Sequence, residues 1–393
     1  MNAAELQKII DWLIDGARSA SPLQMMADVC ERLVEAGLPL WRVGVFVRTL
    51  HPDIFGRNFI WRQGAEVVTG TAGFDVVDTP EFANNPLAIV FGEGREVRCR
   101  LDDPASKRFP FLDEMRAEGV TDYIALPLAF IDGSDHASSW TTKQPGGFSD
   151  GELAALRRIV VPLSRIIEIV NLRRTASNLL DTYVGNRAGE RILGGQIRRG
   201  HTDTMRAAIW LSDLRGFTAL SDRLPAETVV DILNQYFDCQ VSSIRTHGGE
   251  VLKFMGDGLL AVFPVAEQDG DIQQVCARVL QAARESRASV EAMHYPIGEV
   301  LERFRFAVAL HVGPVLYGNI GGGNRLDFTC IGPAVNLAAR LEKIAGRLNR
   351  TIVASARFAG ICEDGWADLG EFPIAGFSNA ERVYGLMDES TLA

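Results

Sequence analysis

One long helical pattern, from about Gly151 to Thr182, divides this chain of 393 residues into two regions that must each build their own core. Its apolar residues recur at alternating steps of three and four, a spacing typical of the seam of a two-stranded coiled coil. An amphipathic helix that packs on its own domain has a similar pattern. We expect a dimer-forming helix over 151–182, bent or loosened at Pro162. The predicted seam comprises Leu153, Leu156, Val160, Leu163, Ile167 and Val170.

The region before this helix, residues 1–150, has the mixed pattern of an α/β domain. Helical spacing appears near the N-terminus and again before a loop that ends at Asp150, which can cap the next helix. Apolar runs between them predict strands. The predicted helices cover Glu5–Val34 and Phe111–Glu118, and the predicted strands cover Trp41–Leu50, Asn58–Arg62 and Tyr123–Ile131.

Charge and cysteine content argue against several classes of function. The formal net charge is -10, so no basic surface for a nucleic acid is indicated. The six cysteines are scattered without a Cys-x-x-Cys pair, which favours reduced, buried thiols. No uncharged apolar run approaches the roughly 18 residues of a membrane span, and the N-terminus lacks the apolar core of a signal peptide. We therefore expect a cytoplasmic protein.

Two further regions follow the long helix. Residues 183–204, rich in Arg and Gly, predict a short amphipathic segment that is either a transducer or a plain linker. Over 205–393, strand and helix patterns alternate, which predicts an α+β domain with an antiparallel sheet and helices on one face. The predicted strands are Ala207–Leu211, Val251–Met255, Leu259–Phe263, Phe304–His311, Thr351–Ala354 and Arg382–Leu386, and the predicted helices are Ala226–His247, Asp271–Arg287 and Ala334–Ala345.

Two aspartates of this last region stand where strands are expected to end. Asp213 follows the apolar run 207–212 and precedes a glycine turn, Leu-Arg-Gly-Phe-Thr, that opens a helix. The backbone N–H groups of such a turn, around Phe217 and Thr218, can cradle a phosphate. Asp257 lies in Gly-Asp-Gly at the tip of the predicted hairpin. Each acid alone also suits a cap or a turn, but together they can hold divalent metal ions.

A strand-to-helix segment, Thr329–Arg340, carries polar residues of another kind. Asn336 and Arg340 are four residues apart, so they share one face of the predicted helix. An amide and a guanidinium there can orient a ribose and neutralise a phosphate. Taken alone, Arg340 would also suit an exposed helix charge.

Four segments resemble the class III adenylate and guanylate cyclases in their order and spacing. The resemblance begins at about residue 200, and it implies a ferredoxin-like catalytic domain over 205–393 that acts as a homodimer. The segments are SDLRGFT (212–218), GGEVLKFMGDGLLAVF (248–263), HVGPVLYGNIGG (311–322) and TCIGPAVNLAARLE (329–342).

This resemblance implies a role for each residue already singled out. Asp213 and Asp257 would bind two metal ions, Mg²⁺ or Mn²⁺. Asn336 would position the ribose, and Arg340 would stabilise the charge that grows on the α-phosphate. In the family, the metal-binding aspartates come from one protomer and the other site residues from its partner. The expected function is the cyclisation of ATP to 3′,5′-cyclic AMP and pyrophosphate at a homodimer interface.

Two further positions bear on the choice of base. Lys253 is a donor only, so it suits N1 of adenine and clashes with the N–H at N1 of guanine. Thr329 would be the second base-reading residue, and a threonine here resembles a subset often linked to bicarbonate stimulation. Guanylate members carry an acid and a cysteine at these places, whereas Cys330 is only adjacent to the second. A guanylate or pyrimidine nucleotide cyclase and an inactive cyclase-like signalling module are the alternatives.

Phosphate binding departs from the family pattern at one point. Many members carry a phosphate-binding lysine before a glycine near the C-terminus, where this chain has Ala375 before Gly376. Arg350 would match a further phosphate-binding arginine, and Arg347 or Lys343 can substitute for the lysine. Weaker ATP binding is the other expected consequence.

The N-terminal region resembles GAF-type sensor domains in FLDEMRAEGVTDYIALPL (111–128) and TKQPGGFSDGELAALRRI (142–159). The resemblance implies a regulatory domain over 1–150 that binds a small molecule, such as a cyclic nucleotide, haem or another metabolite. A ligand-free dimerisation domain is the alternative. The soft-ligand candidates there are Cys30, His51, Cys99 and His136, each of which also suits a structural role.

Overall fold

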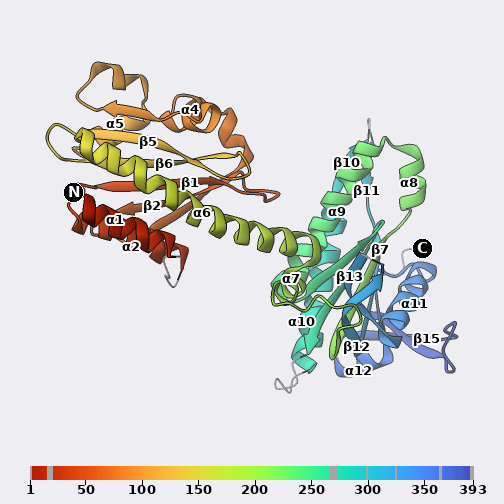
Figure 1. Cartoon of the computed structure of the whole chain (residues 1–393). Helices are drawn as coiled ribbons and strands as arrows, with labels where there is room; N and C mark the ends of the chain where they lie inside the picture. Colours follow the sequence, from red (N-terminus) through yellow and green to blue (C-terminus); the bar gives the residue numbers. More distant parts are fainter. Residues whose placement is uncertain are drawn as a thin grey trace. The chain divides into compact units, whose positions relative to one another are not determined.

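The computed structural model describes residues 2–15, 21–265, 272–297, 300–323, 325–362 and 365–389. The chain forms two compact units, Met1–Thr182 and Tyr183–Ala393, whose elements are drawn in Figure 1. No helix among the described residues is long and apolar enough to cross a membrane. Helices combined with largely antiparallel sheets confirm the predicted α+β class.

The N-terminal unit is built on a six-stranded sheet of order β3-β2-β1-β6-β5-β4. Every neighbouring pair in it is antiparallel. The sequence predicted β1, β2 and β5 but missed the other three, because polar residues, arginine and glycine interrupt their apolar pattern. The strands are β1 Arg42–Arg48, β2 Gly56–Arg62, β3 Val68–Ala72, β4 Val97–Arg100, β5 Asp122–Ala129 and β6 Asp135–Thr142.

Helices cover both faces of this sheet. Helices α1, α2 and α6 share a core with inward-facing residues of β1 such as Val45, while α4 and α5 share the opposite core with residues such as Tyr123. The single helix predicted near the N-terminus is two helices, because Ser21 caps a new helix with Pro22 in its first turn. The helical segments are α1 Ala3–Ile14, α2 Pro22–Glu35, η1 Phe74–Asp78, α3 Pro80–Ala83, α4 Pro86–Glu93, η2 Pro104–Arg108 and α5 Phe111–Ala117.

Helix α6, Asp150–Val184, continues through Pro162, and its first half corrects a prediction. The residues predicted to form a coiled-coil seam face the core of the N-terminal unit instead. Packing on the home domain removes the same apolar surface from water that a partner helix would, so spacing alone could not separate the two. The prediction of a seam there is wrong for Leu153, Leu156, Val160, Leu163 and Ile167, which are all buried in that core.

A second apolar stripe with three-and-four spacing lies further along α6. It consists of Ile169, Leu172, Ala176 and Leu179, and we call it the α6 stripe. Ile169 and Leu172 are 65% and 69% exposed, unlike the buried residues of the first half. The two halves of one helix thus present apolar residues to different surroundings.

The C-terminal unit is built on an eight-stranded sheet of order β15-β16-β14-β12-β7-β9-β8, with β13 paired to β12. Only β12 and β14 are parallel within it. The long pairing of β7 with β12, from Leu214 opposite Phe306 to Thr202 opposite Gly318, extends both strands beyond their predicted bounds. The strands are β7 Thr202–Leu214, β8 Glu250–Met255, β9 Gly258–Val265, β12 Phe306–Gly322, β13 Arg325–Ile331, β14 Ile352–Ser355, β15 Trp366–Phe372 and β16 Glu381–Leu386, with a separate pair β10 His294–Ile297 and β11 Val300–Arg303.

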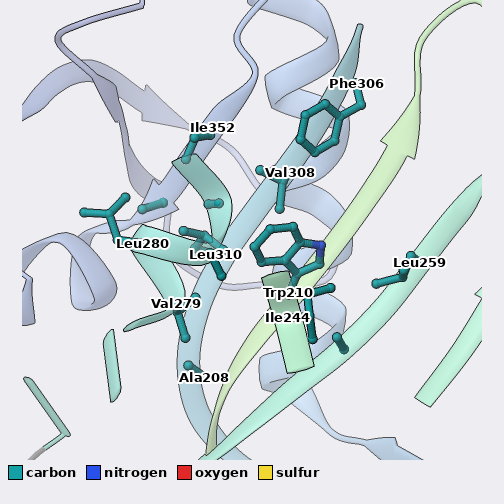
Figure 2. Close-up of a cluster of buried hydrophobic side chains, with 14 of the residues drawn as sticks. Ala208, Trp210, Ile244, Leu259, Val279, Leu280, Phe306, Val308, Leu310 and Ile352 are labelled. Carbon is teal, nitrogen blue, oxygen red and sulfur yellow. The ribbon is translucent and has the colours of Figure 1, made fainter. Parts of the chain in front are cut away.

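Helices cover both faces of this sheet as well, so the prediction of a single covered face is wrong. Trp210 of β7 shares a core with α9, α10 and α12, and Figure 2 shows it beside Val308 and Leu259. The next residue back along β7, Ile209, points to the opposite core with α7 and α11. The helices are α7 Asn186–Leu193, α8 Phe217–Arg223, α9 Ala226–Thr246, α10 Ile272–Ala292, α11 Pro333–Arg347 and α12 Ala356–Ile361.

Candidate active site

The two predicted metal-binding aspartates lie together at the ends of strands β7 and β9. Asp213 is the register partner of Gly258, and Asp257 immediately precedes this glycine in the β8–β9 turn. The predicted hairpin is confirmed, and Gly256 has the positive φ, 67°, of the first central residue of a type II′ turn. A Cβ at Gly258 would lie 3.3 Å from Oδ1 of Asp213. Glycine therefore lets the two acidic strand ends approach closely.

Burial and neighbouring negative charge raise the pKa of Asp213 to about 7. Asp257 contributes through its charge and through a hydrogen bond between the two carboxyl groups. A third carboxylate, Glu342 of α11, adds to this effect, and the pKa of Glu342 is itself raised, chiefly by burial. Lys343 acts in the opposite direction on both groups. Sequence reasoning missed Glu342, because its position two residues after Arg340 does not reveal which side of the helix faces the aspartates.

This acidic pair fits a hard divalent cation. Two carboxyl groups that crowd together repel one another when ionised, and a cation relieves that repulsion. Mg²⁺ is commonly held by one or two carboxylates together with phosphate oxygens of the substrate. Among the residues that the structure describes, no group of three or more His, Cys, Asp or Glu side chains could hold a metal ion. Two carboxylates leave positions in the coordination sphere of such an ion for substrate and water.

The two predicted base-reading residues come from strands that lie against one another, β8 and β13. Lys253 of β8 forms an ion pair with Asp327 of β13, and the two side chains are 44% and 50% exposed. Thr329 follows two residues later, half-buried, opposite Gly318 of β12. Asp327 is a second residue that sequence reasoning missed, since only the approach of the two strands places it opposite the lysine.

Helix α11 carries the ribose and phosphate candidates on an exposed side. Asn336 and Arg340 are both exposed and about one turn apart. Glu342 lies two residues beyond Arg340, which is about 200° around an α-helix, and there it acts on the charge of Asp213. Lys343, whose charge also acts on Asp213, is the next residue along the helix.

The glycine turn after Asp213 opens helix α8 as expected. Gly216 caps this helix in the left-handed conformation, with φ 75°. The side chain of Phe217 packs against the core shared with α9 and α10, so a contact of this residue with a ligand would come from its backbone. Thr218 is exposed.

The side chain of Arg350 is hydrogen-bonded to the C-terminal segment of the chain. Its guanidinium donates to the carbonyl oxygens of Leu386 and Glu389, at 3.3 and 2.6 Å. These bonds hold the C-terminal segment, so the expected phosphate contact of Arg350 has no support in this arrangement. Ala375 is exposed in the loop between β15 and β16. The charge of Lys343, one of the predicted substitutes for the missing lysine, acts on Asp213.

The comparisons with known proteins concern the unit that carries these residues. Residues 201–360 match the family "Adenylate and Guanylate cyclase catalytic domain". An adenylate cyclase of Anabaena cylindrica is 29% identical over 196 residues, which cover 49% of this chain and 38% of that protein. Adenylate cyclase 1 of Rhizobium meliloti is 28% identical over 175 residues, covering 44% and 26%. The crystal structure of the adenylyl cyclase CyaB from P. aeruginosa is 26% identical with a TM-score of 0.42, covering 48% of this chain and 97% of that one.

The family match encloses the candidate site. Its range, 201–360, contains the acidic pair, the strands that carry Lys253 and Thr329, and the whole of α11. The chain spans well under half the length of the two curated relatives, at 26% and 38%. On the family match, residues 201–360 belong to the adenylate and guanylate cyclases, and the C-terminal unit carries a class III nucleotide cyclase catalytic domain.

Proposed function

We propose that this chain is an adenylate cyclase, which converts ATP to 3′,5′-cyclic AMP and pyrophosphate at a site shared by two copies. The observation that carries this proposal is the base-reading pair on β8 and β13. Lys253 can only donate a hydrogen bond, whereas the hydroxyl of Thr329 can accept one. Adenine presents an acceptor at N1 beside a donor amino group, so the pair is complementary to adenine. Guanine would place its own N1–H against the ammonium group.

The remaining residues would act on the sugar and the phosphates. The ribose 3′-oxygen attacks the α-phosphorus and loses its proton to water, and the bond from the α-phosphorus to the bridging oxygen breaks to release pyrophosphate. Asn336 would hold the ribose in line for this attack. Arg340 would donate to the non-bridging oxygens of the α-phosphate, where negative charge grows. The backbone N–H groups at Phe217 and Thr218 would donate to the leaving phosphates.

Asp213 and Asp257 would hold two Mg²⁺ or Mn²⁺ ions, which lower the pKa of the 3′-hydroxyl and neutralise the leaving pyrophosphate. The two aspartates would supply oxygen ligands from neighbouring strand ends, because the pairing of β7 with β9 places Asp213 opposite Gly258, the residue after Asp257. Glu342 increases the negative charge that attracts these cations.

A homodimer is part of this proposal and rests on the family match. In the adenylate and guanylate cyclases the metal-binding aspartates come from one protomer and the other site residues from its partner, so a second copy would complete each site. A two-fold axis would then create two equivalent sites. In one chain alone, the acidic pair and Arg340 would not act on the same ATP molecule.

The α6 stripe is the surface we propose for contact between the N-terminal units of two copies. Its three-and-four spacing suits a parallel pair of helices. With Leu172 and Leu179 at the seam, Glu168 and Arg173 take the flanking positions, five residues apart, where opposite charges of two parallel helices meet. The Glu168 side chain is 18% exposed, pairs with Arg165 at 2.7 Å and accepts from the backbone N–H of Ile131 at 2.8 Å, so it would exchange the arginine for Arg173 of the second copy.

The regulatory role of the N-terminal unit is also a proposal. A six-stranded antiparallel sheet with helices on both faces suits the GAF-like sensor domain expected from the sequence. A cavity of about 610 Å³ would accommodate a small-molecule ligand of the expected kind. It is lined by residues of η1, α3 and α5 and of the turn before α4, among them Val76, Phe82, Asn85 and Phe111.

The soft-ligand candidates of this unit have structural partners. Nδ1 of His136 accepts from the backbone N–H of Arg48, and Nδ1 of His51 accepts from that of Asp53, at 3.0 and 3.1 Å. Burial raises the pKa of both Cys30 and Cys99, the latter to about 11. The contacts of the two histidines and the burial of the two cysteines support a structural role for all four residues.

Guanylate cyclisation is less well supported. Cys330 is buried and lies opposite Tyr317 on β12, on the other side of the strand from Thr329. It therefore faces the protein interior and not a base.

The test is to incubate the full chain with equal ATP and GTP, with Mg²⁺ or Mn²⁺, and to quantify cyclic products and pyrophosphate. Predominant cyclic AMP would support both the reaction and the role of Lys253. Predominant cyclic GMP, or a cyclic pyrimidine nucleotide in a parallel assay with CTP and UTP, would overturn the choice of base. No product under any of these conditions would favour an inactive signalling module.

A further inference from the structure

A buried carboxylate fastens helix α7 to the catalytic sheet. Glu250, the first residue of β8, is 9% exposed. One carboxylate oxygen accepts from the backbone N–H groups of Arg187 and Ala188, at 3.2 and 3.4 Å. The other accepts from the hydroxyl of Tyr317 on β12, at 3.2 Å. Glu250 thus caps the first turn of α7, where an acid is favoured, and ties that turn to two strands.

The start of α7 approaches Glu250 so closely that only glycine fits. Gly185 has φ 87°, and a Cβ there would lie 2.8 Å from Oε1 of Glu250. Ala188 of α7 is fully buried in the core on this face of the sheet, and the guanidinium of Arg191 lies 5.1 Å from the ring centre of Tyr317. Capping, burial and the cation–π contact all hold α7 in one position.

The segment after α7 is fastened to the same strand. The side-chain amide of Asn319, a buried residue of β12, donates to the carbonyl oxygen of Gln196 at 2.6 Å. The carbonyl oxygen of Asn319 accepts from the backbone N–H of Gly200 at 2.9 Å. Residues 185–200 are therefore docked on the sheet at both ends. We call this arrangement the α7 latch.

The latch meets β8 beside the lysine that would read the base. Glu250 is three residues before Lys253, and the pairing of β8 with β9 shifts register between Val251 and Lys253. Such a bulge re-aims the side chains next to it. Leu252, in the bulge, is buried in the same core as Ala188 of α7. A displacement of α7 would therefore act on the part of β8 that aims Lys253.

The latch meets β13 beside the second base-reading residue. Tyr317 lies opposite Cys330, the neighbour of Thr329. Its ring also contacts Phe328 edge-on, with the ring centres 4.8 Å apart. Phe328 and Cys330 flank Thr329, and both are buried in the core that α7 covers. The orientation of Thr329 thus depends on contacts made by Tyr317.

We propose that Glu250 and Tyr317 are positioning residues through which the docked state of α7 sets the placement of Lys253 and Thr329. The inference rests on the proposed cyclase function and adds a point of control to it. Helix α7 directly follows α6 in the chain, so a change in α6 would reach the base-reading residues first. The acidic pair lies on β7 and the β8–β9 turn, and the contacts of the latch do not include it. Release of the latch should therefore loosen the recognition of the base more than it slows the chemical step.

The test compares two glycine substitutions in the full chain. Gly185→Ala introduces both backbone strain and a clash with Glu250. Gly370→Ala is the control outside the latch, because Gly370 also has a positive φ, 104°, but nothing lies within 4 Å of its would-be Cβ. We expect Gly185→Ala to raise the KM for ATP roughly tenfold, with kcat changed by about twofold or less. The preference for ATP over GTP in kcat/KM should fall by a similar factor, and the control should behave as the wild type.

Two further measurements keep the result independent of turnover. Tyr317→Phe removes only the hydroxyl, and it should change the binding ratio of non-hydrolysable ATP and GTP analogues in calorimetry in the same direction. Amide hydrogen exchange of residues 186–193 should speed up in Gly185→Ala and not in Gly370→Ala. The latch is overturned if kcat falls while KM and base preference stay constant, or if both glycine variants behave alike. A wild type that forms no cyclic nucleotide would instead count against the proposed function, while the calorimetric ratio still decides the latch.

Discussion

The candidate site has an acidic half and a cationic half, and the chain builds them by different means. The acidic half, Asp213 and Asp257, is half-buried at two adjacent strand ends and set by a two-residue turn. The cationic half is more exposed and spread over two strands and a helix. Two carboxylates close together favour the binding of a metal ion. Hydrogen-bonding groups on separate elements suit the base, ribose and α-phosphate of a nucleotide, which are also far apart. We assign Lys253, Thr329, Asn336 and Arg340 to the cationic half.

The largest effect should come from the acidic half. Asp257→Ala removes one of the two proposed metal-binding carboxylates, so we expect kcat to fall on the order of 10³-fold or more, as for the loss of an essential electrostatic group. Cyclic AMP formation measured with Mg²⁺ and with Mn²⁺ checks this. Asp238→Ala, an exposed aspartate of α9, is the control and should leave the rate unchanged. A rate within tenfold of the wild type would show that Asp257 is a turn residue only.

Mixing two inactive variants tests whether the halves come from different copies. Asp257→Ala and Arg340→Ala chains, combined in equal amounts, should form mixed dimers with one complete site each. Random pairing would restore roughly a quarter of the wild-type activity, because half of the dimers are mixed and each holds one of two sites. Activity that stays at the level of the separate variants would contradict the shared site.

Within the cationic half, Arg340 should act on the chemical step. Arg340→Ala is expected to lower kcat by about 10²- to 10³-fold with little change in the KM for ATP, since the charge it stabilises is greatest in the transition state. Steady-state kinetics separate these two quantities. Arg245→Ala, on the exposed side of α9, controls for a general loss of positive charge. A rise in KM with an unchanged kcat would make Arg340 a ground-state phosphate ligand.

The base-reading residues should change preference more than rate. Lys253→Glu with Thr329→Cys introduces the residue types that guanylate members carry, and we expect the GTP-to-ATP ratio of kcat/KM to rise by roughly tenfold or more. Asp327→Asn is added in a second version, because Lys253→Glu alone would set two carboxylates against each other. An assay in which ATP and GTP compete measures the ratio of the two kcat/KM values directly. An unchanged ratio in both versions would remove these residues from base recognition.

A smaller effect is expected where two copies are held together outside the catalytic unit. Leu172→Asp with Leu179→Asp should weaken the dimer, and activity at low protein concentration should fall several-fold and recover at high concentration. Sedimentation velocity checks the mass. Leu163→Ala should instead destabilise the N-terminal unit by about 2–5 kcal/mol without this concentration dependence. If activity instead depends on protein concentration in Leu163→Ala and not in the double variant, the buried residues of α6 form the dimer seam.

The smallest effect concerns β12, which pairs with the strand of Asp213 on one side and with the strand of Thr329 on the other. Burial lowers the pKa of His311 on β12 to about 4, and its Nδ1 lies 2.8 Å from Oγ of Ser355. Unfolded histidine has a pKa of about 6.5, so the unfolded chain takes up this proton first as the pH falls. The stabilisation by neutral His311 is complete above pH 6.5 and is lost as the pH falls from 6.5 to 4.

We expect the loss from His311 to reach at most about 2 kcal/mol at pH 5. Urea unfolding of the wild type at pH 7.5 and pH 5 measures the free energy at each pH. His311→Gln should reduce the difference between the two values. An equal difference in both proteins would mean that His311 is not the group that titrates.

Much of the candidate site could be predicted from the local sequence. A Gly-Asp-Gly turn between two apolar runs specifies a hairpin with its acid at the tip, because turn geometry depends on the turn residues themselves. The strand-to-helix step into α11 and the shared face of Asn336 and Arg340 follow from helical periodicity in the same way. The placement of Glu342 and Asp327 could not be predicted, since it depends on which elements pack together.

The sequence by itself determined the two acidic turns, the helices with strong periodicity and the family of the C-terminal unit. Tertiary structure alone decided which apolar stripe of α6 is buried, on which face of the sheet α11 lies, and how Glu250 holds α7. The physical reason is that periodicity specifies an apolar face but not its partner. A core, a second helix and a second copy all remove the same surface from water.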